Sequence, residues 1–345
     1  MVNFNILAGD FAPFVVSYLF NSDTNSLTVL NQSPTGGNCS WISLHPTNKN
    51  ILYSVSEVSP IGGLQSFTIG PEGALSSPID TISSEGDRPA FTVPLSTGQV
   101  AVVNFDGGNA LVVPTEAENP LEFVSSFTPI VFDAPISHPH MVLEHGSEVF
   151  IPDLGADKVW RLVEDGAPGV FKVHGQIDQP TGSGPRHIAI RGNTLYTLHE
   201  TASTLTQQDI PSAPNGTTGP LIANFSGAVM RAAEIQLAEA SPSFPEPFIY
   251  VSNRNIGDPP LDPRGEAITI FRVEPRLEPI GFVFTGLDQI RGMELGGPEN
   301  EFLIASGVAG DGGTIMLKRM EGGRNLEILA RNTEFPTRST FVWLN

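Results

Sequence analysis

The stretch His140-Met-Val-Leu-Glu-His-Gly-Ser-Glu-Val-Phe-Ile151 combines a short alternating segment, a turn and a strongly apolar segment. In the first segment Met141 and Leu143 stand two positions apart, which is the spacing of a strand with one buried face. The same pattern returns 47 residues later, from His187 to Tyr196. The two stretches therefore predict a repeated unit of paired strands joined by a tight turn.

The repeat runs along the whole chain in seven copies, each marked by an apolar residue with another two positions later. Successive copies lie 49, 50, 47, 47, 58 and 48 residues apart. Turn signals every 10 to 12 residues give about four strands in a unit of about 48, which is the size of a β-propeller blade. The first apolar residues of the copies are Ile42, Phe91, Met141, Ile188, Ile235, Met293 and Phe341.

The two ends of the chain complement each other. After Phe341 the chain ends without the later strands of a blade, whereas segments 4–8 and 14–20 read as second and third strands without a first. A strand from one terminus that completes a sheet begun at the other closes a propeller ring without exposed edges. We therefore predict an all-β fold, a single seven-bladed β-propeller domain over residues 1–345, with the ring closed by N-terminal strands joining the C-terminal strand.

A pair of β-sandwiches is the alternative architecture, but it gives no reason for seven copies in phase or for a unit divided between the termini. The longest interval contains the Pro-rich insert at residues 255–264, which we expect to form an extended surface loop that could reshape a pocket.

Charge and cysteine content exclude several classes of partner. The chain has 18 Lys and Arg against 37 Asp and Glu, a net charge of −19, and no basic run that could bind phosphate backbones or anionic membranes. We therefore predict neither a nucleic-acid nor a membrane partner. The single cysteine, Cys39, cannot form an internal disulfide, and no apolar run approaches the roughly 20 residues that span a bilayer. These features favour a cytoplasmic location, with a monomer as the default state.

Polar residues occupy equivalent positions of the repeat, just before the first apolar residue and just after the second strand. In a propeller the first strand of each blade lines the channel, so equivalent positions lie at one height around the axis. The end of an antiparallel second strand returns beside the start of the first. We therefore predict one site at one mouth of the channel, formed by His138, His140, Asp153, Arg186, His187, Glu200, Arg254 and Arg291.

The residue types in this set point to an anionic substrate and proton transfer. Arginine offers paired donors to a carboxylate or phosphate, and histidine and glutamate are readily tuned to exchange protons near neutral pH. Taken singly, His138, His187 and Asp153 are more often structural than functional. The arginines disfavour a bound metal cation, and the chain has no Gly-x-Ser-x-Gly elbow, P-loop or dinucleotide fingerprint. We predict no metal and no cofactor.

Four motifs together carry a resemblance to a known family. They are His138-Pro-His140, Asp153-Leu-Gly-Ala-Asp157, Gly182-Ser-Gly-Pro-Arg-His187 and Ser252-Asn-Arg254. The chain resembles the seven-bladed lactonase family, which contains propeller-type 6-phosphogluconolactonases and carboxy-cis,cis-muconate cyclases. The match runs in order along the chain and is strongest over residues 138–307. The Pro-rich insert interrupts a segment that usually runs straight on in relatives.

The resemblance implies metal-free chemistry on an anionic lactone. It places the catalytic roles on His140, Arg186, Glu200 and Arg254, and the remaining members of the predicted set, His138, Asp153, His187 and Arg291, are assigned to substrate binding. We expect hydrolysis of a carboxylated or phosphorylated lactone, of the 6-phosphogluconolactonase type. A lactone-forming muconate cyclase is the alternative. From other classes, a non-catalytic binding platform and an inactive relative that senses a sugar acid stay open, because a propeller fold does not determine function.

Overall fold

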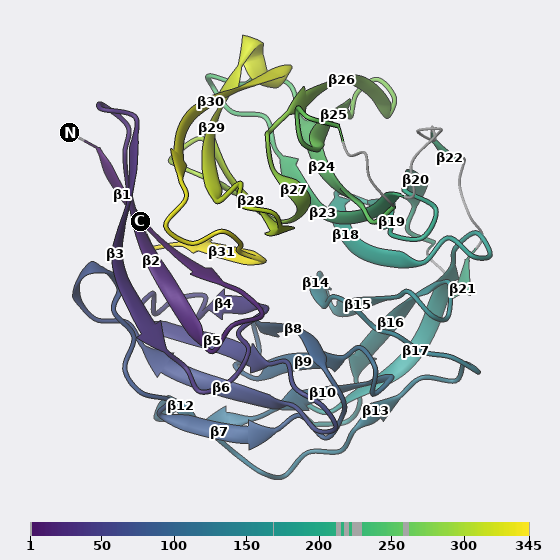
Figure 1. The fold of residues 1–345 in the computed structure, drawn as a ribbon. Helices are drawn as coiled ribbons and strands as arrows, with labels where there is room; N and C mark the ends of the chain where they lie inside the picture. The colour runs from purple at the N-terminus through teal and green to yellow at the C-terminus, as the bar shows by residue number, and fades with distance from the viewer. Residues whose placement is uncertain are drawn as a thin grey trace.

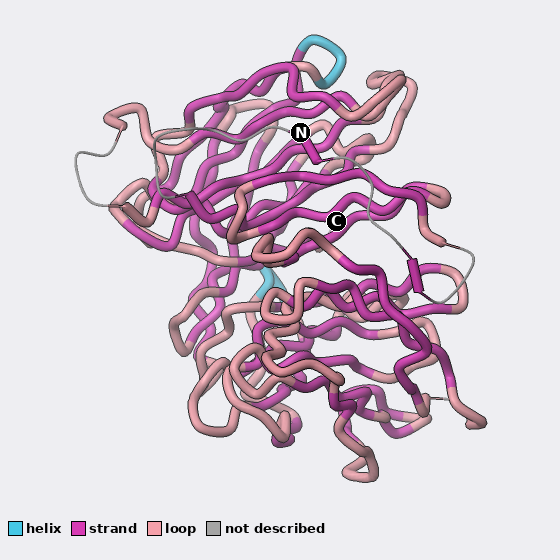
Figure 2. The backbone as a smooth tube through the Cα atoms, turned by 90° about the vertical axis from the view of Figure 1, so that its right-hand side faces the viewer, coloured by secondary structure: helices cyan, strands magenta, loops and turns pink. Residues whose placement is uncertain are grey.

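The computed structural model describes residues 2–167, 169–211, 215–216, 221–222, 230–257 and 262–344. In this part of the chain the helical segments are two three-residue 3-10 turns, Pro71–Gly73 and Glu321–Gly323, and Figure 2 shows strands and loops elsewhere. The predicted all-β class is confirmed.

Seven sheets follow one another around the ring in chain order, as the colours of Figure 1 show. The innermost strand of each sheet is the one that the repeat predicted as the first strand of that blade. They are β4 (Ile42–Leu44), β8 (Pro89–Pro94), β14 (Leu143–His145), β18 (Pro185–Arg191), β23 (Met230–Ala238), β27 (Asp288–Gly296) and β31 (Thr340–Trp343).

In six blades the other strands follow outward in chain order, and a two-stranded ribbon of β11 (Thr115–Glu116) and β12 (Asn119–Phe123) lies apart from them. The pairing is antiparallel except between β17 and β21. The outer strands of the six blades are β5 (Ile51–Ser56), β6 (Gly63–Thr68) and β7 (Asp80–Ser83); β9 (Val100–Asn104), β10 (Asn109–Val113) and β13 (Ile130–Val131); β15 (Glu148–Asp153), β16 (Lys158–Glu164), β17 (Phe171–Asp178) and β21 (Asn215–Gly216); β19 (Thr194–His199), β20 (Thr204–Asp209) and β22 (Leu221–Ile222); β24 (Phe248–Asn255), β25 (Ala267–Arg272) and β26 (Glu278–Phe284); and β28 (Phe302–Ala309), β29 (Thr314–Met320) and β30 (Asn325–Asn332).

The seventh blade closes the ring as predicted. It has the order β3 (Ser26–Pro34), β2 (Phe14–Asn21), β1 (Asn3–Gly9) and β31, so the C-terminal strand is innermost and the N-terminal strands complete the sheet. β1 pairs with β31 from Ile6 opposite Trp343 to Gly9 opposite Thr340. Figure 1 shows the purple N-terminal strands beside the yellow β31. The closure leaves β1 paired on both sides, with β2 and with β31, so the N-terminal strand is not an open sheet edge.

Apolar side chains from alternate strand positions pack between neighbouring blades. Met293 and Leu295 of β27, two positions apart, join a buried cluster with Tyr250 and Ile268 of the preceding blade. Burial of each such side chain contributes about 1.5 to 3 kcal/mol relative to exposure. The period-2 spacing therefore records the contact between one blade and the next, which fixes the inner strands around the channel.

Two local predictions differ in detail from the structure. The third inner strand begins at Leu143 and not at Met141, because the preceding segment makes only an isolated bridge between Pro139 and Asp153. Proline has no N–H to donate to a strand ladder, so the regular pairing starts beyond it. In the predicted loop at 255–264, Asn255 still belongs to β24, and residues 258–261 lie outside the described residues.

Four inner strands carry a register irregularity near their start. In β23 it lies between Ala232 and Ile235. In β8, β18 and β27 one residue is left without a partner on the neighbouring strand. The extra residues are Ala90, Arg186 and Arg291. A bulge turns a side chain out of the regular alternation, and bulges are common beside active sites. All three extra residues line one cavity.

Candidate functional site

A cavity of about 310 Å³ lies where the inner strands begin and the second strands end. Three of the residues predicted to be catalytic, His140, Arg186 and Glu200, line it together with Arg291. The structure thus brings together residues from blades three, four and six. The full lining is Phe11, Asn38, Glu57, Arg88, Ala90, Phe105, His140, Arg186, Glu200 and Arg291.

Glu200 is held by two arginines through one oxygen. Its Oε2 accepts from Arg186 Nη1 at 2.6 Å and from Arg254 Nη2 at 2.8 Å. Its side chain is 16% exposed, and no described residue donates to Oε1. Arg254 stands behind Glu200 and does not itself line the cavity. One carboxylate oxygen is therefore fixed, while the other is open to a water or a substrate.

Arg186 connects the other groups of the site. Its side chain is 3% exposed, its Nε donates to the carbonyl of Ala233 at 2.9 Å, and its Nη1 lies 2.5 Å from His140 Nε2. A guanidinium has donors only, so Nε2 of His140 must accept and the ring proton must sit on Nδ1. These contacts fix the tautomer of His140 and the direction of Arg186 at the same time.

The protonation states follow from burial and from the arginines. Burial lowers the pKa of His140 well below its ordinary value, and the charges of Arg186 and Arg291 lower it further, so the ring is neutral at pH 7. Burial acts to raise the pKa of Glu200, but Arg186, Arg254 and Arg291 together bring it below its ordinary value. The carboxylate is therefore ionised at pH 7.

Burial and the neighbouring positive charges also lower the pKa values of two arginines. Burial, followed by the charge of Arg186, lowers the pKa of Arg254 to about 10 and that of Arg291 to about 9. Both groups stay charged at pH 7. The site is consequently rich in positive charge within a chain whose net charge is −19. That local excess is the property an anionic substrate needs.

His187 lies behind His140 and does not line the cavity. Its Nδ1 is 3.0 Å from Glu234 Oε1, and its ring meets that of His140 edge to face at 5.1 Å between centroids. Burial lowers the pKa of His187, although Glu234 opposes the shift. The predicted substrate-binding residue therefore packs against His140 and is not part of the cavity lining in this structure.

Asp153 and His138 also stand beside the cavity and not in its lining. Asp153 is fully buried, and five donors from neighbouring residues occupy its two carboxylate oxygens. His138 stacks on Phe105 at 4.7 Å, and its Nδ1 lies 2.8 Å from the carbonyl oxygen of Phe105. The structure gives Asp153 the position of a loop-organising residue, with no carboxylate oxygen open to a substrate.

Sequence reasoning left Arg88, Phe11 and Phe105 out of the site. Arg88 stands three positions before the aligned Phe91, as His138 does before Met141, so the repeat phase carried a signal for it. Phe11 belongs to the loop between β1 and β2, and no repeat position marked it. Its ring faces the guanidinium of Arg291, with 4.9 Å between the ring centroid and Cζ.

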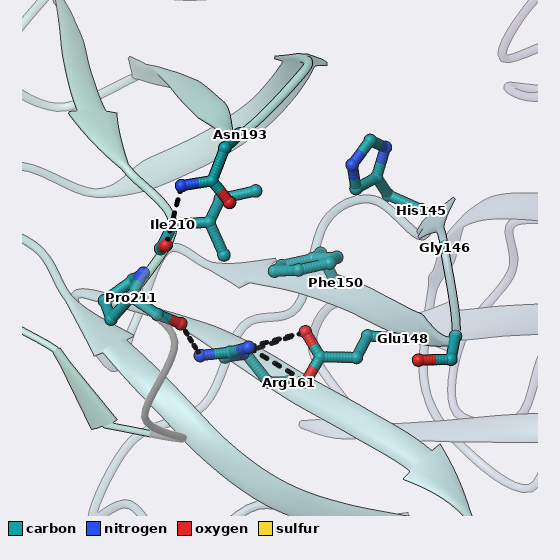
Figure 3. A pocket seen from close by; sticks show the side chains of 9 residues that line it. His145, Gly146, Glu148, Phe150, Arg161, Asn193, Ile210 and Pro211 are labelled. Carbon is teal, nitrogen blue, oxygen red and sulfur yellow. Dashed lines mark hydrogen bonds and ion pairs between the residues drawn. The ribbon is translucent and has the colours of Figure 1, made fainter.

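A second pocket, of about 500 Å³, lies at the opposite end of blades three and four (Figure 3). It also contains a buried arginine, but Arg161 is fully engaged. Its Nε and Nη2 donate to both oxygens of Glu148 over 2.7 to 3.1 Å, and its Nη1 donates to the carbonyl of Pro211 at 2.8 Å. All three nitrogens of the guanidinium already donate to the protein, so this pocket is a weak candidate for binding an anion. The cavity that Arg186 and Glu200 line at the channel mouth (the mouth cavity) is the better candidate.

In the part of the chain that the structure describes, no group of three or more His, Cys, Asp or Glu is placed to hold a metal ion. No helix among the residues that the structure describes is long and apolar enough to cross a membrane.

Comparisons with known proteins agree with the fold. A protein of Arthroderma benhamiae named "Probable 6-phosphogluconolactonase" is 22% identical over 333 residues, which cover 87% of this chain and 78% of that protein. A solved structure from Bacteroides fragilis, titled a "putative 6-phosphogluconolactonase", has a TM-score of 0.84 at 18% identity and covers 99% of this chain and 98% of its own. The periplasmic gluconolactonase of Pseudomonas aeruginosa has a TM-score of 0.83 at 19% identity, covering 100% of this chain and 99% of its own.

At such identities the structural likeness shows the fold alone. The Pseudomonas protein is described as periplasmic, and the cytoplasmic location of this chain stays a prediction. The family model described as "Lactonase, 7-bladed beta-propeller" matches residues 10–343, nearly the whole chain. The chain therefore belongs to the family of seven-bladed β-propeller lactonases.

Proposed function

We propose that this protein is a metal-independent lactonase of the 6-phosphogluconolactonase type, acting on a lactone that carries a phosphate or carboxylate group. The observation that carries the proposal is the state of Glu200. Glu200 lines the cavity, its Oε2 is fixed by two guanidinium groups, and its Oε1 has no hydrogen-bond partner among the described residues. Such a carboxylate can orient one water while the neighbouring arginines bind negative charge.

In the proposed reaction, a water hydrogen-bonded to Glu200 Oε1 attacks the lactone carbonyl carbon. The carboxylate accepts a proton from the water as the new C–O bond forms. The carbonyl oxygen gains negative charge, which Arg186 and Arg291 stabilise from the cavity wall. The bond to the ring oxygen then breaks, and that oxygen takes the proton held by Glu200, leaving a hydroxyl group and a carboxylic acid that ionises.

His140 acts on Arg186 in this scheme. Its neutral ring accepts from Nη1 of Arg186, so it orients the guanidinium without cancelling the positive charge. Arg254 has the matching role on the other side, since it holds Glu200 from behind. Both residues keep the water-binding oxygen and the charge-binding donors in fixed relation, and this reduces the reorganisation needed during reaction.

The test is the rate of 6-phosphogluconolactone opening by the purified protein, measured above spontaneous hydrolysis. The Glu200→Gln variant, prepared in the same way, controls for contaminating lactonases. An enzyme-dependent rate that the variant loses supports the proposal. No rate with wild type would exclude this substrate, and cyclisation of 3-carboxy-cis,cis-muconate, the alternative reaction of the family, would then be assayed. Failure of both would favour a binding platform.

A further inference from the structure

We propose that Arg88 is the specificity-determining residue of the cavity and binds the anionic group of the substrate, remote from the lactone carbonyl. The inference rests on the proposed function, because it concerns the same cavity. It adds a residue that neither the predicted site nor the family motifs include. It also restricts the substrate class to lactones whose phosphate or carboxylate group lies away from the reacting carbonyl.

The side chain of Arg88 lines the cavity but is held only weakly by the protein. It is 58% exposed, and its one ion pair, to Asp106, is 3.4 Å long with that partner 34% exposed. Exposed pairs of this kind contribute little to stability. Arg186 and Arg254, by contrast, are 3% and 10% exposed and share Glu200. Arg88 is the cation at the rim whose donors a ligand can engage at small cost.

The backbone of Arg88 is fixed although its side chain is not. Its N–H donates to the carbonyl of Val58 at 3.3 Å, and its carbonyl accepts from the N–H of Phe105 at 2.9 Å. Its φ is 51°, in the left-handed region that few residues other than glycine, asparagine and aspartate adopt. Loops from two blades therefore hold the Cα of a long flexible cation at the cavity rim.

The other arginines of the cavity are already engaged. Arg186 and Arg254 share Glu200, and the charges of Glu57 and Glu200 act on Arg291. Arg88 has only its long, exposed pair with Asp106. Because the inner arginines are engaged with Glu200 and with the reacting centre, Arg88 is the cation left for a remote anionic group.

The experiment compares two lactones that differ only in the phosphate, 6-phosphogluconolactone and glucono-1,5-lactone. For Arg88→Gln we expect kcat/KM on the phosphorylated lactone to fall about 10- to 100-fold, as for loss of a charged hydrogen bond to phosphate. The value for the neutral lactone should change less than twofold. Arg88→Lys should retain much of the preference, because it keeps the charge. Arg276→Gln, at an 81% exposed arginine paired with Glu278, is the control.

Equal losses on both lactones, or no loss on either, would overturn the role of Arg88. A calorimetric titration with 6-phosphogluconate and gluconate separates this inference from the proposed function, since it needs no turnover. Tighter binding of the phosphorylated acid by wild type, lost in Arg88→Gln, supports the inference even if no lactone is hydrolysed. Equal binding of both acids by wild type would refute it. A further titration with malonate distinguishes a site that also accepts dicarboxylates from one selective for phosphate.

Discussion

Two buried arginine–glutamate groups, at opposite ends of the blades, show how this fold separates stability from function. At the end shown in Figure 3, Arg161 and Glu148 form a one-to-one pair in which every oxygen of the carboxylate has a donor. At the other end, Glu200 serves two arginines through one oxygen. The two glutamate side chains are equally buried, each 16% exposed. The difference therefore lies in the ratio of charges and in the oxygen left open, not in residue type or depth.

Glu200→Gln should give the largest effect on activity. The variant loses the anionic base but keeps the size of the side chain, so we expect kcat to fall about 10³- to 10⁴-fold, the upper part of the range for general-base catalysis. The fold should persist but with lower stability, because Arg186 and Arg254 lose their ionised partner. Steady-state kinetics and the circular dichroism spectrum check the two expectations together. A loss below tenfold would remove Glu200 as the base.

Arg254→Ala comes next. Without its Nη2, Glu200 Oε2 keeps only Arg186, and the carboxylate is freer to rotate. We expect kcat/KM to fall about 10²- to 10³-fold, comparable to removing one preorganised donor. Arg264→Ala, at an exposed arginine paired with Asp262, is the matched control for loss of a guanidinium. Unchanged kinetics in Arg254→Ala would take this residue out of the site.

Glu148→Gln should act on stability alone. It leaves Arg161 buried with a neutral partner, and we expect the free energy of unfolding to fall by about 2 kcal/mol. Because the pair lies at the end of the blades away from the mouth cavity, kcat per folded molecule should be unchanged. Chemical denaturation and the lactonase assay, run on one preparation, measure both quantities. A fall in kcat without a fall in stability would break the distinction between the two groups.

The dependence of activity on pH should be the weakest of these effects, with a constant rate over a broad pH range. Glu200 must be ionised, and its pKa lies below the ordinary 4.5, so activity should be lost only as the pH falls below about 4.5. On the alkaline side, activity should decline as Arg291 loses its proton near its pKa of about 9. Rates corrected for spontaneous hydrolysis should therefore be level between these limits. An acid limb near pH 6.5 would indicate instead a histidine of ordinary pKa as the base.

Positions within the repeat predicted the central residues of the cavity, because hydrophobic alternation indicates where the strands start and end. His140, Arg186 and Glu200 stand at such positions, and the sheet pairing brings them together. The repeat could not predict the direction in which a side chain points. Whether Arg186 lines the cavity depends on a bulge, and a bulge changes the pairing by one residue without a distinct sequence signal.

Loop residues were harder still to predict. Phe11 enters the cavity from a loop of the closing blade, and its place depends on the path of that loop. Asp153 belongs to a family motif, and its position at the end of a second strand places it in the predicted substrate-binding set. Its five protein donors can be counted only once the surrounding loop is folded. A motif marks a residue as constrained without stating whether a substrate or the protein itself imposes the constraint.

The most direct test of the central claim measures Glu200→Gln and Glu148→Gln side by side for 6-phosphogluconolactone opening and for melting temperature. We predict that kcat per folded molecule is lost in Glu200→Gln and kept in Glu148→Gln, while the melting temperature falls in both because each substitution leaves a buried arginine without its ionised partner. If Glu200→Gln retained its rate, or if Glu148→Gln lost as much rate per folded molecule, Glu200 could not be the residue on which the proposed lactonase chemistry depends.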